Sequence, residues 1–378
     1  MDAALRAAGL ASGAAPPLVT LLVTLLLGVA IGYVAFAQKF AALSRRGLRR
    51  RGGFVYTPAG SGAEGFADGA RADAQFNCPE GLAPLPDGSV IVADMGNACI
   101  RLIAAGADVV STLAGKGGEE GFADGPAAAA RFYLPCGVVV GADGAIFVAD
   151  SGNHRVRRIK DGAVTTVAGC RTRGGADGVG AAASFNGPSS LALGPGGVLY
   201  VTEGGGHRVR MISPAGNVTT LAGSGKSGFA DGRAAAARFN GPTGIAVDAA
   251  GVVFVADQYN NRIRRITNGV VDTLAGGSVW GFADGVGAAA QFRFPRGLVL
   301  DPATGHLLVA DFVNNRIRAV NPRSGAVSTL AGSGAEGADD GDAAAASFTR
   351  PSGVAVDAQS GVLVADSFNH LVRRIARS

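Results

Sequence analysis

Short runs of apolar residues separated by turn residues fill the chain from residue 54 onward. The runs are rich in Val, Ile and Leu, turns built on Gly or Asp-Gly separate many of them, and long helical periodicities are scarce. This pattern is typical of β-strands joined by tight turns. The chain has 60 glycines, many of them in Asp-Gly and Pro-x-Gly, which we interpret as further turn positions. The pattern predicts an all-β fold.

One unit of this pattern recurs with a period of 53 to 56 residues, the length of one four-stranded blade of a β-propeller. The sequence Val-x-Thr-x-Ala-Gly begins at Val55, Val110, Val164, Val218, Val271 and Val327. An Asp-Gly follows each copy, at Asp68, Asp124, Asp177, Asp231, Asp284 and Asp340. Eight residues after each aspartate comes a phenylalanine, at Phe76, Phe132, Phe185, Phe239, Phe292 and Phe348. Three residues further comes a proline, at Pro79, Pro135, Pro188, Pro242, Pro295 and Pro351, so the chain contains six units.

Each unit contains four predicted strands. The first begins at the proline, the second ends at an acidic residue, the third reads like Arg-Val-Arg-Arg-Ile, and the fourth is Val-x-Thr-x-Ala. The last unit stops at Ser378 after its third strand, whereas residues 54–58 form a fourth strand that precedes the first unit. Pairing these two segments would close a ring and cover two strand edges. We therefore predict a six-bladed β-propeller of four-stranded antiparallel blades over residues 54–378, with residues 54–58 completing the last blade.

The turn between the second and third strands carries a recurring triplet. It reads Asn369-His370-Leu371 in the last unit, and related triplets begin at Asn153, Asn260 and Asn314. With the period and the spacings, these triplets make residues 54–378 similar to the NHL-repeat family. The resemblance implies a six-bladed propeller that binds protein, peptide or RNA, often attached to a membrane anchor or a catalytic domain. The triplets at Asn97 and Gly206 depart from the pattern, so we expect looser turns there.

An acidic residue at the end of the second strand and an arginine seven residues later recur in every unit. The pairs are Asp94 and Arg101, Asp150 and Arg157, Glu203 and Arg210, Asp257 and Arg264, Asp311 and Arg318, and Asp366 and Arg373. We interpret them as structural ion pairs across a hairpin, because a site for one ligand rarely needs six identical copies. The alternative is a ring of arginines that faces a ligand.

The Asp-Gly aspartates have a second structural interpretation. An alanine-rich stretch such as residues 127–130 follows them, so we expect each aspartate to cap a helical turn and the phenylalanine beyond it to fill the gap between blades. Calcium binding is the alternative, but the other oxygen ligands of a calcium loop are missing at regular spacing. We therefore predict no cofactor, with Ca²⁺ as the alternative.

The position after each strand-one proline differs between units. Its six residues are Glu80, Cys136, Ser189, Thr243, Arg296 and Ser352. At the start of the innermost strand, they are expected to surround one mouth of the central channel and to form a ligand site, with ordinary water sites as the alternative. Trp280 and Phe282 lie in the loop before the fifth blade and are the predicted partner contacts.

The amino-terminal part of the chain has a different composition. Residues 1–17 are a short tail, residues 18–37 are an apolar run long enough for one membrane-spanning helix, and residues 38–53 are a basic linker. The cations from Lys39 to Arg51 predict a single-pass anchor with the propeller on the cytoplasmic side. A signal peptide cleaved after Ala37, which would place the propeller in a lumen or outside the cell, is the alternative.

Charge and cysteine usage narrow the partners. Residues 1–53 carry seven cations and one acid, a net charge of +6, so the remaining chain carries −1 of the total of +5. A nearly neutral propeller lacks the positive field of most nucleic-acid binders, and RNA becomes the less favoured partner. Cys78, Cys99, Cys136 and Cys170 have no metal-like spacing, and either free thiols or a disulfide between blades fits them.

The sequence favours two classes of function. The first is a membrane-anchored, monomeric propeller that binds a protein or peptide on its loop-rich face and is not an enzyme. The second is a metal-dependent hydrolase similar to lactonase propellers, for which only Glu80 is suitably placed. No nucleophile elbow, phosphate loop or redox pair occurs, and we predict neither catalytic nor metal-binding residues.

Overall fold

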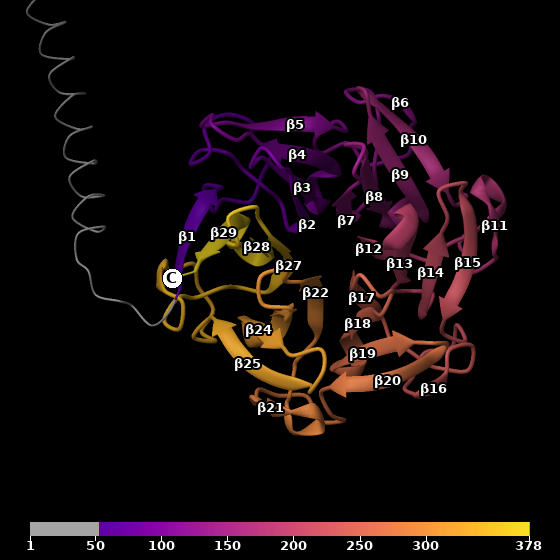
Figure 1. The fold of residues 1–378 in the computed structure, drawn as a ribbon. Helices are drawn as coiled ribbons and strands as arrows, with labels where there is room; N and C mark the ends of the chain where they lie inside the picture. The colour runs from indigo at the N-terminus through magenta and orange to yellow at the C-terminus, as the bar shows by residue number, and fades with distance from the viewer. Residues whose placement is uncertain (1–52, 378) are drawn as a thin grey trace, which may run out of the picture. The chain divides into compact units, whose positions relative to one another are not determined.

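Six antiparallel sheets surround a central axis in the computed structural model, which describes residues 53–377 (Figure 1). The predicted all-β, six-bladed propeller is confirmed. The predicted membrane helix at residues 18–37 lies outside the described residues. None of the short 3₁₀ helices within residues 53–377 has the length and apolar character needed to cross a membrane.

Each blade has four strands, which in the first five blades run outward from the axis in chain order. The first three blades contain β2 (Pro79–Pro84), β3 (Val90–Asp94), β4 (Cys99–Ile103) and β5 (Val110–Ala114); β7 (Pro135–Val140), β8 (Ile146–Asp150), β9 (Arg155–Lys160) and β10 (Ala163–Ala168); and β12 (Pro188–Leu193), β13 (Leu199–Glu203), β14 (Arg208–Ile212) and β15 (Asn217–Ala222). The next two contain β17 (Pro242–Val247), β18 (Val253–Asp257), β19 (Arg262–Thr267) and β20 (Val270–Ala275); and β22 (Pro295–Leu300), β23 (Leu307–Asp311), β24 (Arg316–Val320) and β25 (Ala326–Ala331). The sixth blade contains β27 (Pro351–Val356), β28 (Val362–Asp366), β29 (Leu371–Ala376) and β1 (Phe54–Ala59).

The two ends of the described chain close the ring. Strand β1 pairs antiparallel with β29, and Val55 lies opposite Ile375. The innermost strand of the last blade, β27, also contacts β2 of the first blade. The closure predicted from the repeat count is therefore confirmed, and the edges that an open ring would expose are covered.

Five sheets have a fifth strand that the sequence did not predict. The residues after each Asp-Gly aspartate form a two-residue strand on the outer edge: β6 (Gly125–Pro126), β11 (Gly178–Val179), β16 (Gly232–Arg233), β21 (Gly285–Val286) and β26 (Gly341–Asp342). In the first blade, Gly69 forms a single bridge with Val110 in the same way. Each edge strand precedes its own blade in the chain, so it fastens the connection between blades to the outer surface.

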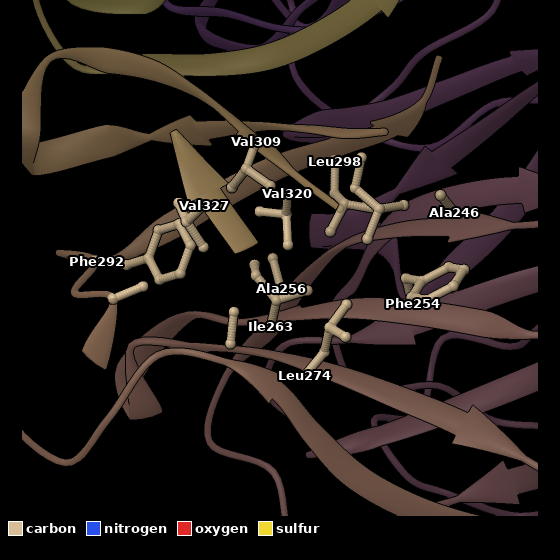
Figure 2. Packing of buried hydrophobic residues seen from close by; sticks show 13 residues of the cluster. Ala246, Phe254, Ala256, Ile263, Leu274, Phe292, Leu298, Val309, Val320 and Val327 are labelled. Carbon is tan, nitrogen blue, oxygen red and sulfur yellow. The ribbon is translucent and has the colours of Figure 1, made fainter. Parts of the chain in front are cut away.

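The hydrophobic core lies between neighbouring blades. In the cluster of Figure 2, Phe292 packs beside Val309, Val320 and Val327 of the fifth blade and belongs to the same buried cluster as Ile263 of the fourth. The equivalent phenylalanines of all six units are fully buried. The prediction that these rings fill the gaps between blades is confirmed, and burial of each contributes about 2–3 kcal/mol.

The Pro-x-Gly glycines at the starts of the innermost strands are strand residues, so their interpretation as turn positions is wrong, whereas Gly88 and Gly216 of other Pro-x-Gly segments do lie in turns. Gly81, Gly244, Gly297 and Gly353 each lie where an added Cβ would meet backbone atoms of the next innermost strand; for Gly353 the atom is the carbonyl oxygen of Glu80. The innermost strands approach one another too closely for a side chain at this position. Only the third blade has a different residue there, Ser190.

Candidate functional site

A fully buried arginine in each blade joins two carboxylates. In the fourth blade, Arg264 donates from Nη1 to Asp257 at 2.6 Å and from Nη2 to Asp231 at 2.5 Å. The pairs predicted from the seven-residue spacing form in all six blades. We call each set of one arginine and two carboxylates a clamp. Carboxylates and backbone carbonyls accept hydrogen bonds from each clamp guanidinium. The clamp arginines therefore stabilise the blade and have little capacity to bind a ligand.

The Asp-Gly aspartates are the second carboxylates of the clamps, and their interpretation as helix caps is wrong. Asp231 accepts from Arg264 and from the Thr273 hydroxyl, so it joins the third and fourth strands of its blade. None of the 3₁₀ helices within residues 53–377 is capped by one of these aspartates. The conserved spacing of 33 or 34 residues between each of these aspartates and its arginine was the signal in the sequence.

In four of the six blades, two aromatic rings lie against the clamp arginine. The Arg318 guanidinium lies 4.9 Å from the ring centre of Phe282 and 5.1 Å from that of Phe292, and Arg316 covers the other side of Phe282 at 3.8 Å. Phe66, Phe122 and Phe229 stack on the arginines of their own blades in the same way. Phe282 was a predicted partner contact, and the structure gives it a packing role that four blades share.

The turns that carry the NHL triplets connect each blade to the next. The residue in the left-handed conformation at the end of the turn accepts a hydrogen bond from a backbone N–H at the start of the following blade. The acceptors are Nδ1 of His154, His207 and His370 and Oδ1 of Asn261 and Asn315, at 2.9–3.2 Å. Sequence reasoning missed this bond. In the first blade Ala98 takes this position and offers no side-chain acceptor.

The backbone of the first departing turn is not looser, contrary to expectation. Ala98 has φ 52° and ψ 36°, close to the 55° and 36° of His370, and Asn97 still donates to Asp94. In the third blade, the turn from Gly204 to Gly206 is not a 3₁₀ helix, and it has no asparagine to donate to Glu203. The departures therefore remove side-chain bonds and, in the third blade, also the helical turn.

The six residues predicted to surround the channel mouth line one cavity. Its volume is about 550 Å³, and besides Glu80, Cys136, Ser189, Thr243, Arg296 and Ser352 its walls include His207, Gln258 and Tyr259 from the NHL turns. Gly81, Gly137, Gly297 and Gly353 border both this cavity and a second one further along the channel, which is lined mostly by Leu, Val and Ala residues. The size lies within the range of small-ligand and peptide side-chain pockets.

Several of the small polar residues at the mouth are already hydrogen-bonded to the backbone. Thr243 Oγ1 donates to carbonyls of the next blade, including that of Pro295 at 3.3 Å, and Ser352 Oγ donates to the Pro79 carbonyl at 3.2 Å. Ser189 Oγ donates to the Gly187 carbonyl, and Cys136 Sγ donates to that of Leu134. Thr243 and Ser352 thus join neighbouring blades, whereas the bonds of Ser189 and Cys136 are local. Glu80 and Arg296 are the charged groups of the cavity.

Glu80 and Arg296 form an ion pair across the mouth. Arg296 Nη1 lies 2.8 Å from Glu80 Oε1 although the two residues are 216 positions apart, and the Arg296 guanidinium lies 3.9 Å from the centre of the Phe312 ring. Burial raises the pKa of Glu80, and the charge of Arg296 opposes this shift. A charged pair held in a concave site is a frequent feature of ligand-binding positions.

Two further groups of the cavity are held in their neutral forms. Burial, reinforced by the charge of Glu80, raises the pKa of the Cys136 thiol to about 12. Burial lowers the pKa of His207, whose Nδ1 accepts the Gly241 N–H, so the neutral ring carries its proton on Nε2. The cavity therefore offers weak neutral donors beside its one ion pair.

The surface around the mouth differs between the two halves of the ring. At the second residue of the NHL turn, the first three blades have Gly96, Gly152 and Gly205, and the last three have Tyr259, Val313 and Phe368. Each of these glycines lies against the residue two positions before the first strand of its own blade; these residues are Asn77, Tyr133 and Asn186. Tyr259 and Phe368 are instead 54% exposed.

Aromatic rings form a connected group around the exposed half. Tyr259 meets Phe294 edge to face at 5.6 Å, and Phe312 meets Phe368 edge to face at 6.0 Å. We call Tyr259, Phe294, Phe312 and Phe368 the aromatic arc. Arg296 follows Phe294 by two residues and covers Phe312, so it connects the two ring pairs. Sequence reasoning missed the arc, although alignment of the turn residues contained the signal.

Trp280 extends this surface outward. Its side chain is 57% exposed, and the Arg293 guanidinium lies 4.4 Å from its ring centre. The Asn314 side chain bonds to the Gly281 carbonyl, which holds the Trp280 loop beside the NHL turn of the fifth blade. The predicted partner residue therefore lies on the face that carries the mouth.

Within residues 53–377 the structure shows neither a cluster of metal-ligating side chains nor a disulfide. In this range no three His, Cys, Asp or Glu side chains come together in a way that could hold a metal ion. The four cysteines are free thiols, so the alternative of a disulfide between blades is not realised.

Comparisons with known proteins agree with this architecture. The NHL repeat family matches residues 132–159, 239–266 and 292–319, which lie in the second, fourth and fifth blades. The protein SUPPRESSOR OF QUENCHING 1, chloroplastic, of Arabidopsis thaliana is 31% identical over 69% of this chain, and NHL repeat-containing protein 2 of Homo sapiens is 28% identical over 75%. The matches span 26% and 44% of these relatives, so the chain corresponds to less than half of either.

Solved structures share the fold at low identity. A structural genomics protein of unknown function from Bacteroides thetaiotaomicron superposes with a TM-score of 0.68 at 19% identity, over 86% of this chain and 76% of the other. A gluconolactonase from Xanthomonas campestris superposes with a TM-score of 0.56 at 12% identity, over 86% and 89%. The repeat matches, the relatives and the closed ring lead to one conclusion: the chain belongs to the NHL-repeat proteins, and its described part is their six-bladed β-propeller.

Proposed function

We propose that this chain is a membrane-anchored binding module that holds a protein or peptide on the face of the propeller that carries the channel mouth. One observation carries the proposal. The residue after the strand-one proline differs between blades, and all six copies of it line one cavity. An exposed aromatic ring, Tyr259, also borders that cavity. The clamps, which serve the fold, recur in every blade, so we attribute the divergence concentrated on one face to a partner.

The chemistry of the face suits a polypeptide partner. Exposed Tyr and Trp side chains, together with arginines stacked on rings, are the residues that dominate the binding energy of protein interfaces. The cavity offers one ion pair and a few neutral donors, a set that orients a side chain or a chain terminus. The anchor, in this proposal, is the apolar run of residues 18–37, which would keep the module at a membrane surface.

A peptide selection with the full chain tests the binding proposal. A displayed random library is selected on the wild-type protein, and enriched peptides are measured against Arg296→Ala and against Arg323→Ala. Arg323 is exposed in a loop at the opposite end of the strands. We expect peptides that bind the wild type and the Arg323 variant alike and lose about tenfold in affinity for the Arg296 variant. Enriched peptides that bind all three proteins equally would contradict the proposal.

The anchor is tested separately. Membranes from cells that express the full chain with a carboxyl-terminal reporter are washed with alkaline carbonate. We expect the full-length protein to stay in the membrane fraction, with the reporter on the cytoplasmic side. Release of a shorter propeller cleaved after residue 37 would show that the segment is a signal peptide instead.

A further inference from the structure

The aromatic arc carries more positive than negative charge, which restricts the partner it can accept. Arg296 and Arg350 lie on its rings, and Arg293 lies on Trp280 at its flank. Arg296 is paired with Glu80 at 2.8 Å, whereas Glu336 reaches Arg350 only at 3.8 Å and is 64% exposed. Among the described residues, no acidic side chain forms an ion pair with Arg293. Two of the three cations are therefore free, or nearly free, to meet an anion from a partner.

Stacking makes these arginines well suited to bind carboxylates. The Arg350 guanidinium lies 5.6 Å from the centre of Phe312 and 5.8 Å from that of Phe368, so it is within cation–π range of both rings. A guanidinium held on a ring keeps its N–H edge available in a fixed direction, and the ring displaces water that would weaken an ion pair. Arg293 and Trp280 repeat this arrangement further out. The surface thus presents exposed apolar rings and oriented cations together.

We propose that the aromatic arc binds an acidic peptide segment that also carries apolar side chains, with carboxylates on Arg293 and Arg350 and an apolar side chain over Phe368. This inference rests on the proposed function and specifies its partner. In the opposite half of the mouth, Gly96, Gly152 and Gly205 take the matching positions. Tyr133 beside Gly152 is 37% exposed there, and within residues 53–377 no arginine stacks on its ring. The segment therefore lies across the fourth to sixth blades.

The local charges favour an acidic peptide over single-stranded nucleic acid, although bases also stack on aromatic rings. A phosphate backbone requires positive charge along its whole path. In this structure Glu80 already neutralises the cation at the centre of the mouth, and each clamp has two carboxylates for one arginine. A peptide that places only two carboxylates, each at an arginine, brings fewer negative charges near these carboxylates than a phosphate backbone does.

The test uses the full chain and three defined probes. One probe is a labelled ten-residue peptide that alternates Glu with Leu and Phe, the second has Lys in place of every Glu, and the third is a ten-nucleotide polyuridine. Binding is measured by anisotropy of the label and by the fluorescence of Trp280, the only tryptophan of the chain. We expect the acidic peptide to bind about tenfold more tightly than the Lys peptide and to change the Trp280 emission.

Variants locate the interaction. Arg350→Gln is expected to weaken binding of the acidic peptide about fivefold, while Arg323→Gln on the opposite face leaves it unchanged. Arg350→Glu is expected to weaken the acidic peptide further and to improve the Lys peptide, which a general loss of folding would not do. Equal binding of the two peptides, or tighter binding of polyuridine, would overturn the inference.

The outcomes also separate this inference from the proposed function. If selected library peptides require Arg296 but show no excess of acidic residues, the binding face stands and its assignment to acidic segments fails. If no library peptide depends on the mouth face, both proposals fail together.

Discussion

The clamps and the channel mouth are built from the same repeat and have opposite patterns of variation. Every blade has a buried arginine between two carboxylates, whereas the mouth has six positions with an acid, a base, a thiol and three hydroxyl residues. The clamp lies inside a blade and needs no other blade, so identical copies suffice. The mouth is shared by all blades, so a difference in one of them changes a single common site. The comparison teaches that repetition in this chain marks stability and that divergence marks the surface proposed for binding.

Removal of a clamp arginine is expected to have the largest effect on stability. In Arg264→Leu, the carboxylates of Asp257 and Asp231 lose their shared cation, and Asp257 is fully buried. We expect the free energy of unfolding to fall by about 3–5 kcal/mol in urea denaturation. Arg296→Leu, which removes an arginine from the mouth, serves as the matched control and is expected to cost about 1 kcal/mol or less. Equal losses in the two variants would remove the distinction between clamp and mouth.

Alanine at a glycine of the innermost strands is expected to have the next largest effect. In Gly353→Ala the new methyl group meets the carbonyl oxygen of Glu80, which belongs to the adjoining blade. The strands must separate, at a cost of about 1–3 kcal/mol in the free energy of unfolding. Ser190→Ala, at the equivalent position of the third blade, is the control and is expected to change stability much less. A neutral Gly353→Ala would show that the ring is less tightly closed than described.

The fold was predictable from the sequence because its signals are periodic. Six copies of two spacings gave the blade number, and the split fourth strand gave the closure through Val55 and Ile375. The pairing of Glu80 with Arg296 was not predictable, because it depends on the separation of two blades across a ring and not on any spacing along the chain. The aromatic arc was present in the sequence as a break in the turn pattern, but only the structure shows which rings of neighbouring blades meet.

The hydrogen bonds between blades are expected to make a smaller contribution. His154→Ala removes the acceptor for the Gly187 N–H and should lower the free energy of unfolding by about 1 kcal/mol, whereas His154→Asn restores the acceptor found in the fourth and fifth blades. Conversely, Ala98→Asn supplies an acceptor where the first blade has none and is expected to raise stability by a similar amount. A destabilised Ala98→Asn protein would contradict this account of the turn.

The hydrogen bond that His154 accepts from the Gly187 N–H predicts that the free energy of unfolding depends on pH. Burial lowers the pKa of His154 below its ordinary value of 6.5, so the unfolded chain binds the proton more readily than the folded one. The contribution of neutral His154 to the free energy of unfolding, measured relative to His154→Asn, is therefore fully present above pH 6.5. It decreases as the pH falls below that value. Urea denaturation of both proteins between pH 5 and pH 8 measures this difference, and a difference that does not change with pH would refute the assignment.

The thiol of Cys136 reports on the electrostatics of the mouth without altering stability. Because burial and the charge of Glu80 raise its pKa to about 12, alkylation by iodoacetamide at pH 8 should be about a thousandfold slower than for an ordinary cysteine. Glu80→Gln removes the nearby negative charge and is expected to speed the reaction several-fold, as measured by mass spectrometry of the Cys136 peptide. A slower reaction in that variant would contradict the described geometry.

The most direct test of the account compares binding and folding in one pair of variants. Phe368→Ser alters an exposed ring of the aromatic arc, and Val270→Ser alters an exposed apolar residue at the start of β20, away from the mouth. The measurement is the dissociation constant of a library-selected peptide for each variant, together with its free energy of unfolding. We predict that Phe368→Ser binds about tenfold more weakly, that Val270→Ser binds like the wild type, and that both fold with nearly unchanged stability. Unchanged affinity in Phe368→Ser would contradict the claim that the divergent half of the mouth is the binding surface.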